Sequence, residues 1–125
     1  MPHIVLYYVS QGILIMKLDE ENIRRSLSEL KKVLTHRFGE NIEVYLYGSV
    51  ARNDYHPESD IDILVLFPGE VDTALEEEVF DLAYEVELEC DVVFGVIVHS
   101  KEFWASEKAA VMPFHQNLQK EAMQI

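Results

Sequence analysis

Two aspartates separated by one residue, Asp60 and Asp62, interrupt an otherwise apolar run near the middle of the chain. Because alternate residues of a β-strand point to the same face, we expect the two carboxylates to be neighbours if segment 60–67 forms a strand. Adjacent carboxylates repel each other, and one would take up a proton unless a cation lay between them. Mg²⁺ commonly binds one or two carboxylates together with phosphate oxygens. The pair therefore indicates a metal-assisted phosphate site.

A glycine–serine pair, Gly48 and Ser49, ends the preceding apolar run, and ten residues separate Ser49 from Asp60. Glycine lets the backbone approach a ligand closely. A short helix that begins at Ser49 would direct free N–H groups at a phosphate, and Arg52 follows one turn later. Taken alone, each feature has an ordinary explanation, since Gly-Ser pairs form turns and Asp-x-Asp recurs by chance in acidic proteins. Together they predict a nucleoside triphosphate site.

Asp91 is the natural candidate for a third carboxylate. It begins segment 91–98, which we expect to form a strand beside segment 60–67, because strands linked by one helix are often neighbours. Three carboxylates could hold two Mg²⁺ ions that orient a triphosphate for in-line attack. If Asp91 faces solvent instead, the site has two acids and is slow or inactive.

The remaining pattern supplies the elements that position these residues. Ile23, Leu27, Leu30, Leu34 and Phe38 are spaced for one face of a helix that starts near Asp19 and stops near Gly39. A second helix is expected from the spacing of Val71, Leu75, Val79, Leu82 and Val86. We expect strands at 42–47, 60–67 and 91–98, a helix from Ser100, and a short helix or extended tail at the C-terminus. This order predicts a small α/β domain with one sheet.

The N-terminal segment permits two interpretations. Residues 1–15 could form a β-hairpin with Ser10, Gln11 and Gly12 as its turn, or they could be an upstream extension, with Met16 as the natural start. The segment lacks a basic leader and a small-residue cleavage site, so it is a poor signal peptide. Residues 16–125 are expected to form a single domain.

Composition excludes several classes of function. The chain of 125 residues has 23 acidic and 10 basic side chains, a formal charge of −13, and no basic stripe, which disfavours nucleic acid as a direct partner. No stretch is long enough to span a membrane, and the single cysteine, Cys90, fits a reduced intracellular setting. The five histidines lack ligand spacing for zinc. The acidic run at 70–91 is expected to be a solvated helix face, or a surface that meets a basic protein.

The motif residues resemble the polymerase-β-like nucleotidyltransferases, and more closely the minimal nucleotidyltransferases that act as antitoxins beside HEPN toxins. Segments 96–104 and 113–125 are similar to further parts of that family, and the resemblance runs from Met16 to the end of the chain. Asn53 stands where the family often has glycine, and the tail has Ala122 where glycine is usual. The residues that match the family's central pattern are Gly48, Ser49, Ala51, Arg52, Ser59, Asp60, Ile61 and Asp62.

This resemblance implies a small mixed sheet flanked by helices and the use of ATP with Mg²⁺, two ions being expected. It implies transfer of AMP to a tyrosine of a partner HEPN toxin, within a hetero-oligomer in the cytoplasm. Asp60 and Asp62 would bind the metals. Asp91 would complete the site or activate the acceptor hydroxyl. Gly48 and Ser49 would hold the triphosphate, with Arg52 and Ser59 as further nucleotide-binding residues.

Two alternatives remain open at this stage. The chain could neutralise its partner by binding alone, as a nucleotidyltransferase fold with little catalysis. It could also transfer a nucleotide to a small molecule such as an aminoglycoside, although 125 residues leave little room for an acceptor domain and a partner chain would have to supply one.

Overall fold

The computed structural model describes residues 5–8 and 14–125, with side chains from residue 18 onward. Two short strands, β1 (Val5–Tyr8) and β2 (Leu14–Lys17), pair antiparallel. This pairing is compatible with the hairpin alternative, and the expected turn at residues 10–12 lies outside the described residues. The division into residues 1–15 and a domain at 16–125 stays a prediction.

The main sheet has four strands in the order β5-β4-β3-β6. Strands β3 (Glu43–Tyr47) and β4 (Ile61–Phe67) are antiparallel, β5 (Phe94–Ser100) is parallel to β4, and β6 (Met123–Gln124) is antiparallel to β3. The predicted mixed sheet is therefore confirmed. The predicted adjacency of the two strands that α3 (Thr73–Cys90) connects is confirmed as well.

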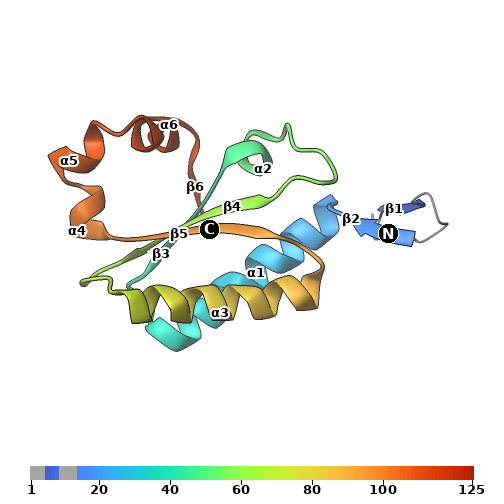
Figure 1. Cartoon of the computed structure of the whole chain (residues 1–125), viewed down its shortest axis with the longest axis horizontal. Coiled ribbons are helices and arrows are strands. Elements are labelled where there is room, and N and C mark those ends of the chain that lie inside the picture. The colour runs from blue at the N-terminus through green and yellow to red at the C-terminus, as the bar shows by residue number, and fades with distance from the viewer. Residues whose placement is uncertain (1–4, 9–13) are drawn as a thin grey trace.

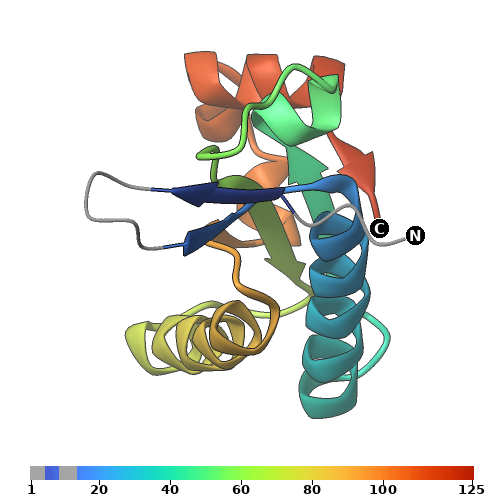
Figure 2. The same ribbon diagram turned by 90° about the vertical axis from the view of Figure 1, so that its right-hand side faces the viewer.

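Helices cover both faces of this sheet (Figure 1). The long helices α1 (Glu20–Phe38) and α3 lie on one face. Figure 2 shows the same layers from the end of the sheet, with the four short helices on the opposite face. These short helices are α2 (Gly48–Arg52), α4 (Lys101–Trp104), α5 (Glu107–Ala110) and α6 (Pro113–Glu121).

Local sequence signals explain the two long helices. Asp19 caps α1 by accepting a hydrogen bond from the backbone N–H of Asn22, whose side chain bonds back to the cap residue. Asp72 caps α3 in a similar way through the N–H of Leu75. The predicted apolar periodicity of α1 is confirmed, since Leu30 and Leu34 are fully buried.

Strand β4 divides its side chains between two apolar clusters. Four of its side chains join the larger core, which lies between the sheet and the helices α1 and α3: Ile61, Ile63, Val65 and Phe67. The alternate residues Leu64 and Leu66 join a smaller cluster on the other face, where Leu118 of α6 covers them. Asp62 belongs to this second face, at the point where the apolar cover ends.

The C-terminal segment, expected as a short helix or an extended tail, forms both the helix α6 and the short strand β6. None of the helices in the described part of the chain is long and apolar enough to cross a membrane.

Candidate active site

The structure places Asp60 and Asp62 together at the start of β4. Asp62 lies opposite Tyr47 of β3 and Gly95 of β5, and it is half-buried, whereas Asp60 precedes the strand and is exposed. Burial raises the pKa of the Asp62 carboxyl, and the negative charge of Asp60 raises it further. This mutual repulsion is the electrostatic signature expected of a cation site, so the donor set fits a hard divalent ion.

Two glycines make room for the Asp62 carboxylate. Gly48 has φ +74°, and a Cβ atom built at this residue would overlap the Asp62 carboxylate oxygen. A Cβ atom at Gly95 would lie 3.0 Å from the other carboxylate oxygen. Gly48 is therefore required both for its backbone conformation and for close approach to Asp62. The sequence motif identified Gly48, but Gly95 emerges only from the register of β5 against β4.

Helix α2 begins at Gly48, one residue before the predicted start at Ser49. Arg52 lies in its last turn and contacts two carboxylates, with 3.1 Å from Nε to Asp54 Oδ2 and 3.0 Å from a terminal nitrogen to Glu121 Oε2. Asn53 ends the helix in the left-handed conformation, with φ 60°. Asparagine thus serves at the position where the family often has glycine, because its short polar side chain tolerates this conformation.

Glu121, at the end of α6, enters the site from the far end of the chain. Its carboxylate accepts a hydrogen bond from the backbone N–H of Gly48 at 3.1 Å and two from Arg52 at 3.0 and 3.2 Å. The Glu121 carboxylate therefore already occupies two of the groups expected to bind the triphosphate, the Gly48 N–H and Arg52. Motif reasoning missed Glu121, although the similarity of segment 113–125 to the family tail was a signal that this segment carries more than packing.

Tyr47 is a second residue that the motif did not indicate. It lies beside Asp62 across the β3–β4 pair, and its ring packs edge-on against Phe114 at a centroid distance of 5.5 Å. Burial raises its pKa to about 12, and the charges of Asp62 and Glu121 add to this effect. The raised pKa favours the neutral phenol at this position.

The two predicted serines have different surroundings. Ser49 is half-buried within α2, and its carbonyl accepts hydrogen bonds from the N–H groups of Asn53 and Asp54. The hydroxyl of Ser59 accepts a hydrogen bond from the N–H of His56 at 3.0 Å, which closes the loop before β4. Ser49 thus lies within the short helix next to Gly48, while Ser59 fixes the loop that leads to Asp60.

Asp91 does not lie in a strand beside Asp60 and Asp62. It caps the C-terminus of α3 in the left-handed conformation, with φ 56°, and its side chain is exposed. The expectation that segment 91–98 begins a strand at Asp91 is wrong, since β5 begins at Phe94. No group of three or more His, Cys, Asp or Glu side chains suited to a metal occurs among the described residues. The role of Asp91 as a third acid stays a prediction.

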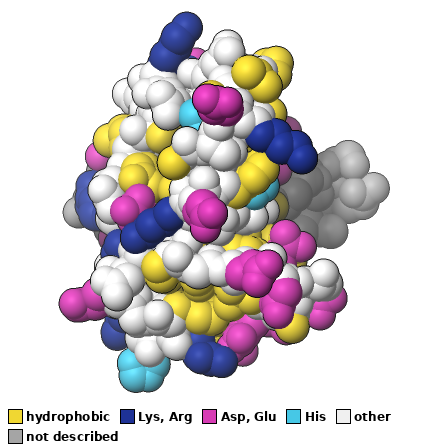
Figure 3. Space-filling model, turned by 90° about the vertical axis from the view of Figure 1, so that its left-hand side faces the viewer, with side chains coloured by type: hydrophobic (Ala, Val, Ile, Leu, Met, Phe, Trp, Pro, Cys, Tyr) yellow, Lys and Arg dark blue, Asp and Glu magenta, His cyan; other side chains and the backbone are white. Residues whose placement is uncertain are grey.

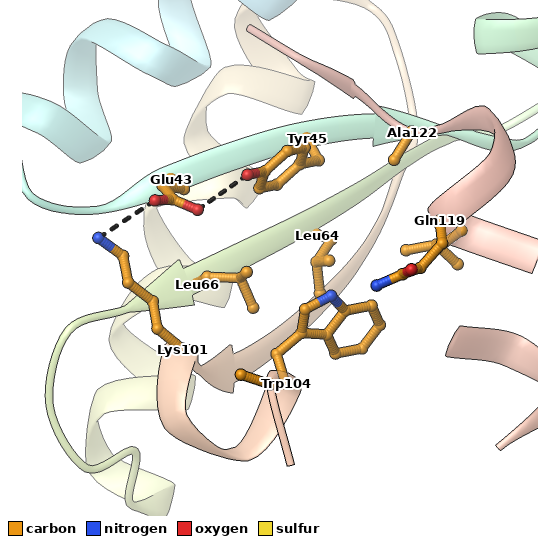
Figure 4. A pocket seen from close by; sticks show the side chains of 10 residues that line it. Glu43, Tyr45, Leu64, Leu66, Lys101, Trp104, Gln119 and Ala122 are labelled. Atoms are coloured by element: carbon orange, nitrogen blue, oxygen red, sulfur yellow. Dashed lines mark hydrogen bonds and ion pairs between the residues drawn. The ribbon is translucent and has the colours of Figure 1, made fainter. Parts of the chain in front are cut away.

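A pocket of about 410 Å³ opens on the same face of the sheet, further along β4 (Figure 4). Leu64 and Leu66 form its floor and Trp104 lies beside them. Glu43 accepts a hydrogen bond from the Tyr45 hydroxyl at 2.8 Å and pairs with Lys101 at 3.4 Å. The predicted site residues do not line this pocket, so the pocket and the carboxylate site are separate features.

The fold and this constellation define the class of protein. A helix-flanked mixed sheet carries paired aspartates at the start of one strand and a Gly-Ser turn packed against them. The sequence profile of the nucleotidyltransferase domain matches residues 27–119. The chain belongs to this family.

Two relatives from one organism extend the comparison. The chain is 36% identical over 101 residues to a Methanocaldococcus jannaschii protein named "Putative protein adenylyltransferase MJ0604", covering 80% of this chain and 94% of that protein. A second protein of the same organism, "Putative protein adenylyltransferase MJ0141", is 29% identical over 76 residues, covering 60% of this chain and 77% of that protein.

Solved structures agree on the fold. A structure described as a "putative minimal nucleotidyltransferase" matches with a TM-score of 0.54 and 25% identity, over 86% of this chain and 97% of that one. A toxin–antitoxin structure with AMP-PNP matches with a TM-score of 0.51 and 19% identity, over 86% of this chain and 72% of that one. The predicted resemblance to minimal nucleotidyltransferases and the predicted fold are both confirmed.

Proposed function

We propose that this chain transfers AMP from ATP to a tyrosine hydroxyl of a HEPN-type toxin and so acts as its antitoxin in the cytoplasm. The observation that carries the proposal is the packing of the Gly48 turn against the Asp62 carboxylate, with Asp60 next to it. The M. jannaschii relatives that bear the name adenylyltransferase support the reaction class. The similar fold in a toxin–antitoxin complex that holds AMP-PNP supports an adenine nucleotide as substrate and a toxin as partner.

In this proposal each residue has a defined task. Asp60 and Asp62 would hold Mg²⁺, which neutralises charge on the triphosphate when bound. The Gly48 N–H and Arg52 would bind phosphate oxygens once Glu121 has released them, and Ser49 would add a hydroxyl donor. The acceptor oxygen forms a bond to the α-phosphorus and loses its proton to solvent or a base. The bond from this phosphorus to the bridging oxygen breaks, and pyrophosphate leaves.

Intact-mass spectrometry of the co-encoded HEPN-type protein tests this proposal. The protein is incubated with this chain, ATP and Mg²⁺, and separately with the Asp60→Ala/Asp62→Ala variant. Mass added to the partner in steps of one AMP, absent with the variant, is the expected result. A partner that forms a stable complex and is silenced without added mass would contradict it.

The second candidate is an antitoxin that acts by binding alone. It is favoured by the backbone position of Asp91, which caps the end of α3 and is not part of strand β5. Retained neutralisation by the Asp60→Ala/Asp62→Ala variant would support this candidate over the enzyme.

A further inference from the structure

Helix α3 carries more apolar surface than the core uses. Phe80, Tyr84 and Leu88 are exposed by 40%, 58% and 65% and are spaced four residues apart. Residues at this spacing are neighbours on a helix surface, so the three side chains form one apolar row. The residues that α3 buries against the sheet are others: Val79, Ala83, Val86 and Cys90. A row of three large exposed apolar side chains is typical of an interaction site.

An acidic row runs along the helix beside this apolar row. Glu77, Asp81 and Glu85 repeat at the same spacing of four, and all three are exposed. Within the described part of the chain, none of these carboxylates forms an ion pair, and only Glu78 of the neighbouring positions is paired, with Arg37. Figure 3 shows acidic side chains gathered on this side of the molecule. The surface thus combines apolar contact area with unpaired negative charge.

The apolar row also borders a hollow at the edge of the sheet, which Asp81 of the acidic row lines as well. The hollow, of about 340 Å³, lies between α3 and β5, and its lining residues include Phe80, Tyr84, Phe94 and Val96. Strand β5 lies at one edge of the main sheet, and no other described strand pairs with its outer side. Glu87 accepts a hydrogen bond from the N–H of Phe94 at 2.7 Å and so covers the start of this edge.

We propose that the apolar row, the acidic row and this hollow together form the docking surface for the toxin partner. The partner segment that fits is amphipathic, with apolar side chains that cover Phe80, Tyr84 and Leu88 and with Lys or Arg side chains opposite Glu77, Asp81 and Glu85. This inference rests on the proposed function for the identity of the partner. A second copy of this chain is a poor occupant, because it would bring two acidic rows together on chains of charge −13.

Binding measurements with surface variants test the docking surface. Titration calorimetry uses the co-encoded HEPN-type protein and this chain in an Asp62→Asn background, so that no transfer occurs. The variant Phe80→Ser/Tyr84→Ser/Leu88→Ser is expected to bind about tenfold more weakly or worse, because apolar anchors dominate interface energetics. The matched control is Val111→Ser, which alters an apolar residue that is 74% exposed outside α3 and should bind as the parent does.

Charge reversal provides a second, independent variant. Asp81→Lys/Glu85→Lys is expected to slow association and to weaken its dependence on salt, since exposed charges act mainly on the encounter rate. The control Glu102→Lys/Glu107→Lys makes the same change in net charge on α4 and α5. Circular dichroism melts confirm that each variant is folded. Binding of both α3 variants with the parent's affinity and rate would overturn the proposal, as would failure of the parent to bind this partner.

Photocrosslinking identifies the occupant directly. With p-benzoylphenylalanine in place of Tyr84, the expected product joins this chain to a partner segment rich in apolar and basic residues. A product only with a second copy, or with residues 1–17 of the same chain, would overturn the proposal. The mass assay for AMP transfer is read separately. Weakened binding by the α3 variants without transfer would refute the transferase alone, and transfer with unchanged binding would refute the docking surface alone.

Discussion

The carboxylate of Asp62 occupies the space in which a side chain of residue 48 would have to lie. The two residues come from different elements, Gly48 from the start of α2 and Asp62 from β4. Their contact joins the phosphate-binding turn to the metal-binding carboxylate of the proposed site. Because an alteration at either residue disturbs the other, this contact offers the sharpest test of the geometry.

Gly48→Ala is expected to damage both the fold and the activity. The left-handed backbone alone costs about 1–2 kcal/mol for a residue with a Cβ atom, and the added methyl group must displace Asp62. Displacement by about 1 Å predicts a loss of transfer of about 10²-fold. Denaturant unfolding and the rate of AMP transfer measure the two effects. The control Gly69→Ala, where a Cβ atom meets open space, should change neither. Parent-like transfer by Gly48→Ala would contradict the proposed role.

Asp62→Asn is expected to slow transfer strongly while leaving the fold intact. Loss of a proposed metal ligand would remove several kcal/mol of charge stabilisation, which predicts a decrease of about 10²-fold or more. Burial and the charge of Asp60 disfavour the ionised form of Asp62 in the folded state, so the neutral amide should melt at an equal or higher temperature. Calorimetry and the mass assay check both statements. A variant that melts lower and retains transfer would show that Asp62 serves the fold instead.

Glu121→Gln is expected to lower the KM for ATP several-fold. The carboxylate of Glu121 holds the Gly48 N–H and Arg52, the same donors that a triphosphate would need, and a neutral amide competes for Arg52 less well. Steady-state kinetics separates KM from kcat. Glu107→Gln, an exposed change on α5, is the matched control. A fall in kcat at unchanged KM would instead make Glu121 a positioning residue for Arg52.

Asp91→Asn tests the prediction that Asp91 is the third acid, against the alternative that it serves only as the cap of α3, in which case transfer stays within about twofold of the parent. Asparagine tolerates the left-handed conformation that residue 91 adopts at the end of α3, so the substitution removes the charge and keeps the cap. The mass assay and a thermal melt of the same preparation measure the outcome. A loss of about 10²-fold in a variant that melts normally would assign Asp91 to the site as the third acid after all.

We expect His99 to make the folding stability dependent on pH. Its ring is half-buried and stacks on Trp104 at a centroid distance of 5.7 Å, and burial lowers its pKa below 6.5, against a smaller opposite effect of Glu76. The unfolded chain therefore binds this proton more tightly than the folded chain. The contribution of the neutral His99 ring to the free energy of unfolding is intact above pH 6.5. It is lost as the pH falls from 6.5 through the lowered pKa of the folded state.

Urea unfolding at several pH values between 8 and 5 measures this loss, because this range brackets the ordinary histidine pKa of about 6.5. In a His99→Gln variant, the decrease in the free energy of unfolding over this range should be smaller than in the parent. An identical decrease in both proteins would show that other groups cause it.

The sequence by itself determined the local elements and the paired aspartates. The spacing of Ile23, Leu30 and Leu34 predicts α1, because it repeats with the helix period. The nearly continuous apolar run after Asp60 predicts β4, in which side chains alternate between the two faces with a period of two. The proximity of Asp60 to Asp62 follows from that same period. The Gly-Ser turn was placed correctly to within one residue, since glycine with positive φ is a local property.

Only the tertiary structure decided which distant groups share the site. Glu121 meets Gly48 across 73 residues because α6 packs on the face of β3 and β4, and no local pattern encodes that contact. The parallel register of β5 brings Gly95, rather than a third acid, opposite Asp62. The start of the third predicted strand was misplaced at Asp91 because the chain uses this residue to end α3 in a left-handed cap, and a helix end is set by what the helix packs against as much as by its own residues.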